Sequence, residues 1–399
     1  MSSTMKPTVV LVTGANRGLG FEVVKKLVAT STDPNKIIIL LGSRNLQRGQ
    51  EAISRLGSPP NVHLLQLDTS SQDSIARATK EIEEKYNGYL NVLINNAGIS
   101  KRERRIDVAR EIFATNYYGV KMVNEYMFPL LGENARIVNV SSEIGSWTLY
   151  KASSDLQNQY SSPTLTTEEL DQLVKDFLSA IEQDKLDTSG YDPKSPLLIY
   201  GVSKAALTAL TRIEARQWSA IKNVLVLAVC PGYCATDITN HAPGARPAEL
   251  GADSILYAVN TSQNELENGA FYQDGVKKPQ HSVRELTAAI DIEQRAAVIG
   301  QFRERVFNLL ISTNAAACGI DIDDVSLVIN YDMPVTTDFK PDYETYLHRI
   351  GRCSKLGYTF NLIGSEKDFN IMKAIEEYFR YPIDGITIEA ISNLESDHE

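Results

Sequence analysis

The chain has 399 residues, 43% of them hydrophobic, and a formal net charge of −10 at pH 7. This length exceeds what a single hydrophobic core usually serves, so two domains are expected. The longest apolar runs, such as 37–41, have strand length, and neither a signal peptide nor a membrane span is predicted. Four cysteines without paired metal-ligand spacing favour reduced thiols in a cytosolic protein over a disulfide scaffold or a metal site.

The negative charge is concentrated in the last part of the chain. From residue 283 onward, twenty Asp and Glu face eleven Lys and Arg, whereas the first 282 residues carry thirty against twenty-nine. An acidic segment repels phosphate backbones, so nucleic-acid binding by this part is not expected. The predicted domains are 1–282 and 283–399.

The first apolar run, 9–12, is followed by three glycines, Gly14, Gly18 and Gly20, and then by a helical pattern over 21–28. This order predicts a buried strand, a tight turn and a helix N-terminus. Glycine lets the backbone approach a pyrophosphate closely, and the free amides and dipole of the helix start favour its negative charge. We therefore predict a dinucleotide-binding turn, which also includes Asn16, Arg17 and Leu19.

The second predicted strand, 37–42, ends in Ser43 and Arg44 with no acidic residue where a reader of the ribose 2′-hydroxyl would lie. A carboxylate there would repel a 2′-phosphate, whereas Arg44, together with Arg17, can neutralise it and bind it with two hydrogen bonds. The sequence therefore predicts NADP(H) rather than NAD(H). The alternative is that these are two exposed arginines without a ligand.

A later strand, 90–94, leads into Asn95, Asn96, Ala97 and Gly98. Together with T-G-x-x-x-G-x-G after the first strand, this wording resembles the short-chain dehydrogenase/reductase superfamily over about residues 6–282. The resemblance implies an α/β fold with a Rossmann-type doubly wound parallel sheet. It places Asn95 to Gly98 at the adenosine side of the cofactor.

By the same resemblance, Asp68 meets the adenine, because it follows the third predicted strand, 62–67. An Asp at a strand end could instead cap the helix that begins at Ser71. Asn116 lies inside a predicted helix, where an amide competes for backbone hydrogen bonds. In the family the matching Asn opens the helix locally and holds a water of the proton relay; the alternatives are a capping role or a satisfied surface amide.

The fifth predicted strand, 136–140, ends in Ser141 and Ser142, at the edge where open α/β sheets bind ligands. The resemblance makes Ser142 the catalytic serine, which donates to the substrate carbonyl oxygen, and Ser141 the weaker candidate.

Two tyrosines have a lysine four positions later: Tyr117 with Lys121, and Tyr200 with Lys204. Position favours Tyr200, because it follows the serine strand and opens a new helix over 203–218. We expect Lys204 to lower the phenol pKa from its usual value of about 10 and to bind the nicotinamide ribose. Tyr200 then gives its proton to the developing alkoxide.

Tyr200 lies 58 positions after Ser142, far more than in most members of the superfamily. Thr166 and Glu169 read as a capping box, and apolar residues then recur on one helical face over 170–181. The extra helix resembles that of monomeric carbonyl reductases, in which such an insert covers the surface that relatives use for dimerisation. A monomer is therefore predicted.

The strand at 224–229 is followed by Pro231 and Gly232, which the resemblance identifies as the loop on the nicotinamide side. Thr236 is then placed for the carboxamide. Tyr233 would line the substrate pocket and suit flat aromatic or apolar carbonyls. Cys230 is interpreted as a buried thiol, and 269–275 as the last strand of the domain.

The final segment resembles part of the second RecA-like domain of DEAD-box RNA helicases, over about residues 285–390. The resemblance rests on a helical run at 292–306 and on L-L-I-S-T-N, G-I-D-I-D-D-V and Y-L-H-R-I-G-R in order. The first strand of that domain is missing, so we predict an incomplete RecA-like α/β segment.

This segment also departs from the helicase pattern. No phosphate loop ending in Gly-Lys-Ser/Thr occurs in the chain, and Cys318 replaces an arginine. Where the family continues to a third arginine, Cys353 and Lys355 stand, and lysine cannot supply the planar fork of a guanidinium. ATP hydrolysis is therefore not expected.

The leading prediction is an NADPH-dependent reductase of aldehydes, ketones or quinones, with no metal and no membrane partner. The alternative is an RNA-associated adaptor that uses the helicase-like remnant. A dehydrogenase working in the oxidative direction is a third possibility. The appended segment is interpreted as vestigial, as a contact surface, or as the product of a joining error in the gene model.

Overall fold

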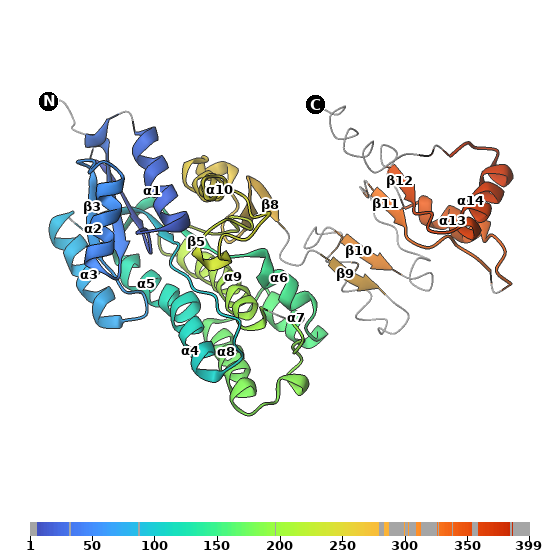
Figure 1. Ribbon diagram of the computed structural model, residues 1–399, viewed down its shortest axis with the longest axis horizontal. Coiled ribbons are helices and arrows are strands. Elements are labelled where there is room, and N and C mark those ends of the chain that lie inside the picture. The colour runs from blue at the N-terminus through green and yellow to red at the C-terminus, as the bar shows by residue number, and fades with distance from the viewer. Residues whose placement is uncertain are drawn as a thin grey trace. The chain divides into compact units, whose positions relative to one another are not determined.

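The computed structural model describes residues 6–31, 33–86, 88–195 and 197–278, and further on 283–286, 299, 302, 309–312, 325, 327–336, 338–352, 358–383 and 385. The chain divides into two compact units, Met1–Ser282 (unit 1) and Val283–Glu399 (unit 2). Figure 1 shows the elements of each unit, which we describe separately.

Unit 1 is built on an eight-stranded sheet with the strand order β3-β2-β1-β4-β5-β6-β7-β8. Every neighbouring pair is parallel except the last, in which β8 runs antiparallel to β7. The predicted doubly wound α/β fold is therefore confirmed, and β8 is an addition that the sequence did not indicate. The strands are β1 Thr8–Val12, β2 Ile37–Ser43, β3 Val62–Gln66, β4 Leu90–Asn95, β5 Leu131–Val140, β6 Leu225–Val229, β7 Phe271–Gln273 and β8 Val276–Lys278.

Helices cover both faces of this sheet because alternate residues of each strand point to opposite sides. Val10 and Val12 pack with α1, α2 and α10, whereas Val9 and Leu11 pack with α3 and α5. Among the described residues, no helix is both long and apolar enough to span a bilayer. The helices are α1 Gly18–Thr30, α2 Leu46–Arg55, α3 Gln72–Lys85, α4 Ile106–Phe113, α5 Val120–Met127, α6 Glu143–Tyr150, α7 Ser154–Ser161, α8 Thr167–Glu182, α9 Leu198–Ser219 and α10 Ala248–Asn260.

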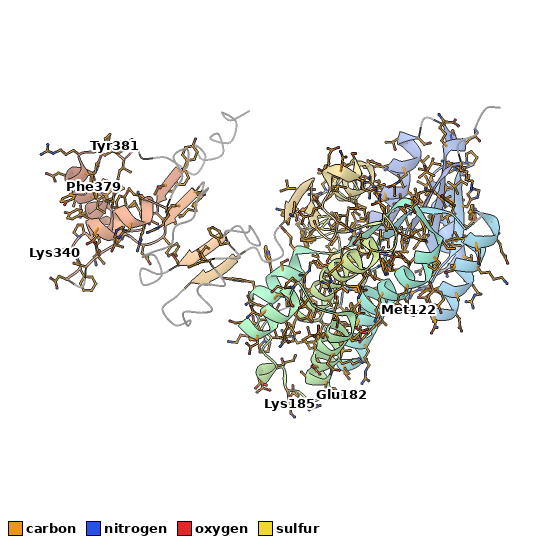
Figure 2. The ribbon with its side chains drawn as sticks, turned by 180° about the vertical axis from the view of Figure 1, so that it is seen from behind. Met122, Glu182, Lys185, Lys340, Phe379 and Tyr381 are labelled. Carbon is orange, nitrogen blue, oxygen red and sulfur yellow. The ribbon has the colours of Figure 1, made fainter. Side chains whose placement is uncertain are left out.

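The insert between the serine strand and Tyr200 forms α7 and α8. The capping box of α8 is present, with the Thr166 and Glu169 side chains each accepting from the other's backbone amide. The apolar face of α8 packs on α4 and α9, and the ring of Phe177 lies 5.8 Å from that of Phe113 and 4.8 Å from that of Tyr191. Figure 2 shows Glu182 and Lys185 at the outer end of this insert. The insert is thus an integral layer of unit 1.

Polar contacts fix the insert from two sides. The guanidinium groups of Arg212 and Arg216, on α9, donate to backbone carbonyls of residues 160, 161, 163 and 165. Asp171, on α8, accepts from the Tyr117 hydroxyl at 2.8 Å and from Lys121 Nζ at 2.6 Å. These contacts satisfy carbonyls and charges that would otherwise be buried without partners.

Unit 2 contains two short parallel pairs, β9 Val283–Leu286 with β10 Leu309–Ser312 and β11 Leu327–Asn330 with β12 Tyr358–Asn361. Helices α13 Tyr343–Ile350 and α14 Glu366–Phe379 contribute to a small core of Met333, Tyr346, Ile371 and Ile375. Phe379 and Tyr381, at the end of α14, are labelled in Figure 2. The expected helix at 292–306, apart from residues 299 and 302, lies outside the described residues, as do Cys318 and the 353–355 run.

The packing of the insert predicts the effect of truncating its central ring. Phe177→Ala removes a fully buried phenyl group and should lower the free energy of unfolding of unit 1 by about 3–5 kcal/mol. Urea unfolding followed by circular dichroism measures this change. Lys175→Ala, on the exposed face of the same helix, should change it by less than about 0.5 kcal/mol. Equal effects of the two variants would mean that α8 is not docked in solution.

Candidate active site

The glycine turn after β1 has the geometry that binds a phosphate. Gly14 and Gly18 have φ angles of +62° and +55°, a region that side-chain-bearing residues rarely adopt. A Cβ on Gly20 would lie 2.5 Å from the Asn96 amide nitrogen and 2.9 Å from the Gly14 carbonyl oxygen. Arg17, at the N-cap of α1, makes no side-chain capping bond, so the first amides of the helix remain available to an anion.

The end of β4 closes against this turn. The backbone amides of Asn96 and Ala97 both donate to the Thr13 hydroxyl at 3.0 Å, and the Asn96 side chain donates to the Thr13 carbonyl at 2.9 Å. The two sequence motifs that suggested a nucleotide site therefore lie in direct contact.

The two arginines expected at a 2′-phosphate differ in their surroundings. Arg44 follows β2, is exposed, and has no hydrogen bond or ion pair within the described part of the chain. Arg17 instead pairs with Asp237 at 2.5 Å, on the loop after β6. Arg44 is therefore the better placed of the two to bind an incoming phosphate.

Asp68 does not cap the helix that follows it, so that alternative is wrong. Its Oδ1 accepts from the backbone amide and the hydroxyl of Ser70, at 3.0 and 2.7 Å. The cap of α3 is Ser71, whose hydroxyl accepts from the Ser74 amide at 3.3 Å. The Asp68 turn lies at the carboxyl end of β3, on the edge where this fold binds its ligand.

Asn116 lies in a π-helical turn, Ala114–Gly119, which joins α4 to α5. Its side chain is fully buried, so the interpretation as a surface amide is wrong. Its Oδ1 accepts from the Ile99 amide at 2.9 Å, and its Nδ2 donates to the Ile99 carbonyl at 2.9 Å and to the Ser203 hydroxyl at 3.1 Å. The helix thus widens at Asn116 and is tied there to the segment after Gly98.

The structure distinguishes the two serines after β5. Ser141 Oγ donates to the Lys204 carbonyl at 3.1 Å and lies 2.7 Å from Thr208 Oγ1, so its hydroxyl is occupied by α9. Ser142 is the N-cap of α6, where its Oγ accepts from the Ile144 amide at 3.3 Å, and its hydroxyl lies near enough to the Tyr200 phenol to affect the pKa of that group. Ser142 is therefore the serine that meets the phenol.

Close packing of α6 on α9 brings this pair together. A Cβ on Gly145 would lie 2.7 Å from the Ala205 backbone nitrogen, and one on Gly201 would lie 1.9 Å from the Thr148 hydroxyl. Each helix thus approaches the other through a glycine, at a separation that a larger residue would prevent.

Lys204 lies one turn after Tyr200 and is buried. Its Nζ donates to the Val140 carbonyl at 2.7 Å and lies 5.7 Å from the centre of the Tyr200 ring. A Cβ on Gly98 would be 3.6 Å from Lys204 Nζ and 3.5 Å from Asn116 Oδ1. The residues predicted to be catalytic therefore converge beside the end of the N-N-A-G segment.

The expected lowering of the Tyr200 pKa is wrong for this structure. Burial raises the pKa of Tyr200 to about 12, the neighbouring Cys230 adds to the rise, and the nearby Ser142 hydroxyl only partly opposes it. Burial also lowers the pKa of Lys204 to about 8. The spacing of the two residues correctly predicted that Lys204 lies next to Tyr200. It could not predict that both groups are buried, and burial determines the direction of both pKa shifts.

The rival Tyr117 and Lys121 face the insert instead of the nucleotide turn. Both bind Asp171, and burial together with that carboxylate holds the pKa of Tyr117 far above its usual range. This pair is structural.

The loop after β6 lies against the glycine turn. Thr236 Cγ2 is 3.6 Å from the position of a Cβ on Gly18, and Gly232 has a φ of +75°. Tyr233, expected to line a substrate pocket, is 59% exposed. Pro231 accepts from the thiol of Cys234, and both Cys230 and Cys234 are buried and unoxidised.

Three residues with a role in this geometry carried no sequence signal. Ser203 binds the Asn116 amide, and Arg246 holds both carboxylate oxygens of Asp274 at 2.7 Å, which anchors the loop after β6 to the β7–β8 turn. A serine inside a helix and a distant Arg and Asp become informative only when the fold brings them together.

Comparisons with protein families identify both parts of the chain. The model of the short chain dehydrogenase family matches residues 8–156, and the model of the helicase conserved C-terminal domain matches residues 249–357. The second match begins within unit 1, at α10, earlier than the expected start near residue 285. Both resemblances drawn from the sequence are confirmed.

Individual relatives cover unit 1. The chain is 36% identical over 279 residues to carbonyl reductase [NADPH] 3 of Rattus norvegicus, a match that spans 67% of this chain and 96% of the relative. Salutaridine reductase from Papaver somniferum is 28% identical, with a TM-score of 0.59 and coverage of 66% of this chain and 99% of that one. Menthone neomenthol reductase from Mentha piperita is also 28% identical, with a TM-score of 0.57. That match covers 68% of this chain and 100% of the other. The chain therefore belongs to the short-chain dehydrogenase/reductase family and carries a helicase C-terminal-like region as well.

Proposed function

We propose that unit 1 is an NADPH-dependent carbonyl reductase that converts aldehydes, ketones or quinones to alcohols. The observation that carries this proposal is the convergence of Ser142, Tyr200, Lys204 and Asn116 beside the end of the N-N-A-G segment, which contacts the glycine turn. The name of the rat relative, carbonyl reductase [NADPH] 3, supports the same reaction and cofactor.

The residues around the glycine turn fit NADPH, which would supply the hydride. Uncapped helix amides and glycines without a Cβ suit its pyrophosphate, and Arg44, which has no partner among the described residues, suits its 2′-phosphate. The residues that would hold the cofactor are Gly14, Asn16, Arg17, Gly18, Leu19, Gly20, Arg44, Asp68, Asn95, Gly98, Tyr200, Lys204, Pro231, Gly232 and Thr236.

Tyr200 acts as the general acid. Because its pKa is raised to about 12, the phenol keeps its proton at neutral pH until negative charge develops on the substrate oxygen. Ser142 donates a hydrogen bond to that oxygen and stabilises the charge. The ammonium of Lys204 stabilises the phenolate once the proton has left, and Asn116 holds a water through which that proton is replaced.

The substrate enters beside Tyr233, whose exposed ring favours flat aromatic or apolar carbonyl compounds. The direction of the reaction follows the NADPH/NADP ratio, so the oxidative alternative needs no different residue. We further propose that the protein is a monomer, because the insert covers α4 and α9 and leaves less of their surface free for a second copy of the chain.

The general-acid role predicts a large loss of activity on removing one oxygen atom. Tyr200→Phe should lower the rate of NADPH oxidation with an aromatic aldehyde by about 10²-fold or more. Tyr117→Phe is the matched control, because Tyr117 also has a lysine four positions later. The rate of this variant should stay within about threefold of that of the unaltered protein. Steady-state absorbance at 340 nm measures both, and a fully active Tyr200→Phe variant would remove the proposed acid.

The charge of Arg44 predicts cofactor preference. Arg44→Asp places a carboxylate at the end of β2, where it repels a 2′-phosphate and can accept from a 2′-hydroxyl. Its KM for NADPH should rise about 10-fold or more, and that for NADH should fall. Arg48→Asp, an exposed arginine on the next helix, is the charge-matched control. An unchanged NADPH/NADH ratio in Arg44→Asp would contradict the assignment.

The helicase family match supports a second candidate function, an RNA-associated adaptor without ATPase activity. A truncation that separates the two functions should follow Lys278, because β8 pairs with β7 and Lys278 Nζ lies 3.7 Å from Glu143 Oε1. A 1–278 protein should retain the reductase kcat/KM within about twofold and, like the full chain, sediment as a monomer. RNA binding by the full chain at physiological salt, without NADPH binding, would favour the adaptor instead.

A further inference from the structure

A ring of buried polar side chains lies behind the proposed active site. Asn95, at the end of β4, donates through Nδ2 to Asn124 on α5 at 2.6 Å and to Asn139 on β5 at 2.9 Å. Asn124 Nδ2 donates to Glu214 Oε2 at 2.8 Å, and Asn139 Nδ2 donates to Thr211 Oγ1 at 2.9 Å. Glu214 and Thr211 both lie on α9, three positions apart and therefore on one face of the helix. Helix α9 thus closes the ring.

Every member of the ring comes from an element that carries a site residue or leads directly to or from one. Strand β4 leads into the N-N-A-G segment, α5 follows the π turn of Asn116, β5 leads to Ser142, and α9 carries Tyr200 and Lys204. Side-chain amides in a dry interior fix distances sharply, because each lost bond leaves an unsatisfied buried polar group.

We propose that Glu214 is a positioning residue for the reductase, acting through Asn124 and Asn95 to hold the cofactor-side strand end at a fixed distance from the helix of Tyr200 and Lys204. The proposal rests on the function given to this site above. The distance concerned is that between Gly98 and the Lys204 side chain. A Cβ added to Gly98 would lie 3.6 Å from Lys204 Nζ.

The surroundings of Glu214 favour its neutral form. Its side chain is buried, and no ion pair reaches it among the described residues. The positive charge of Lys121 favours the ionised form, but Lys121 is bound by Asp171, and Glu125 adds a second negative charge. Burial accordingly raises the pKa of Glu214 well above its usual value. A neutral acid accepts from Asn124 as a glutamine would, so Glu214→Gln should preserve the ring, whereas Glu214→Leu should break it.

The test compares Glu214→Leu and Glu214→Gln in the full-length chain. Fluorescence titration gives the Kd for NADPH, and steady-state kinetics gives KM and kcat. Glu214→Leu should weaken NADPH binding about 10-fold with a comparable rise in the KM for NADPH, while kcat at saturating NADPH changes less. Glu214→Gln should restore both constants to within about twofold of the unaltered protein, a rescue that a charge-dependent role would not show.

Thr211→Val breaks the second arm with little change of shape and provides an independent variant if Glu214→Leu does not fold. It should also raise the Kd for NADPH, by about threefold or more. Unchanged NADPH binding in both folded variants would overturn the proposal, as would a Glu214→Gln variant impaired as much as Glu214→Leu. If the unaltered chain bound no NADPH at all, the proposed function itself would fail, and that result is distinct from either outcome.

Discussion

The close approach of α6 to α9 is the constraint on which the candidate site depends. Gly145 and Gly201 let the two helices meet with backbone against side chain, and Ser142, at the start of α6, then reaches Tyr200 on α9. A serine and a tyrosine 58 positions apart could not be held next to each other by loops alone without a large entropic cost. Two rigid helices in contact remove that cost in advance, so the pair is preorganised before any substrate arrives.

Local motifs were the most readable part of the sequence. The glycine turn, the N-N-A-G segment and the capping box of Thr166 and Glu169 depend on residues that lie close together in the chain, and the structure has all of them. The spacing of residues along the sequence could not show which side chains are buried. The Tyr200 phenol and the Lys204 ammonium are neighbours as expected, yet the loss of water around them decides the direction of both pKa shifts.

Contacts between distant segments explain the remaining differences. Arg17 was expected to face a phosphate with Arg44, but Asp237, 220 residues away, binds it in this structure. The ring of Asn95, Asn124, Asn139 and Glu214 likewise joins parts of the chain that share no local pattern. Polar residues of this kind read as ordinary helix or strand positions until the tertiary fold shows that each is buried with a specific partner.

Asp171 decides what would follow from loss of the α8 helix. Because this carboxylate is bound by both Tyr117 and Lys121, loss of α8 would remove the one acceptor that binds the phenol on the π turn and the ammonium on α5 together. A shortening of the chain at this point would thus destabilise the turn that holds Asn116. A viable deletion of the helix therefore needs compensating changes at positions 117 and 121, which makes the insertion hard to reverse once acquired.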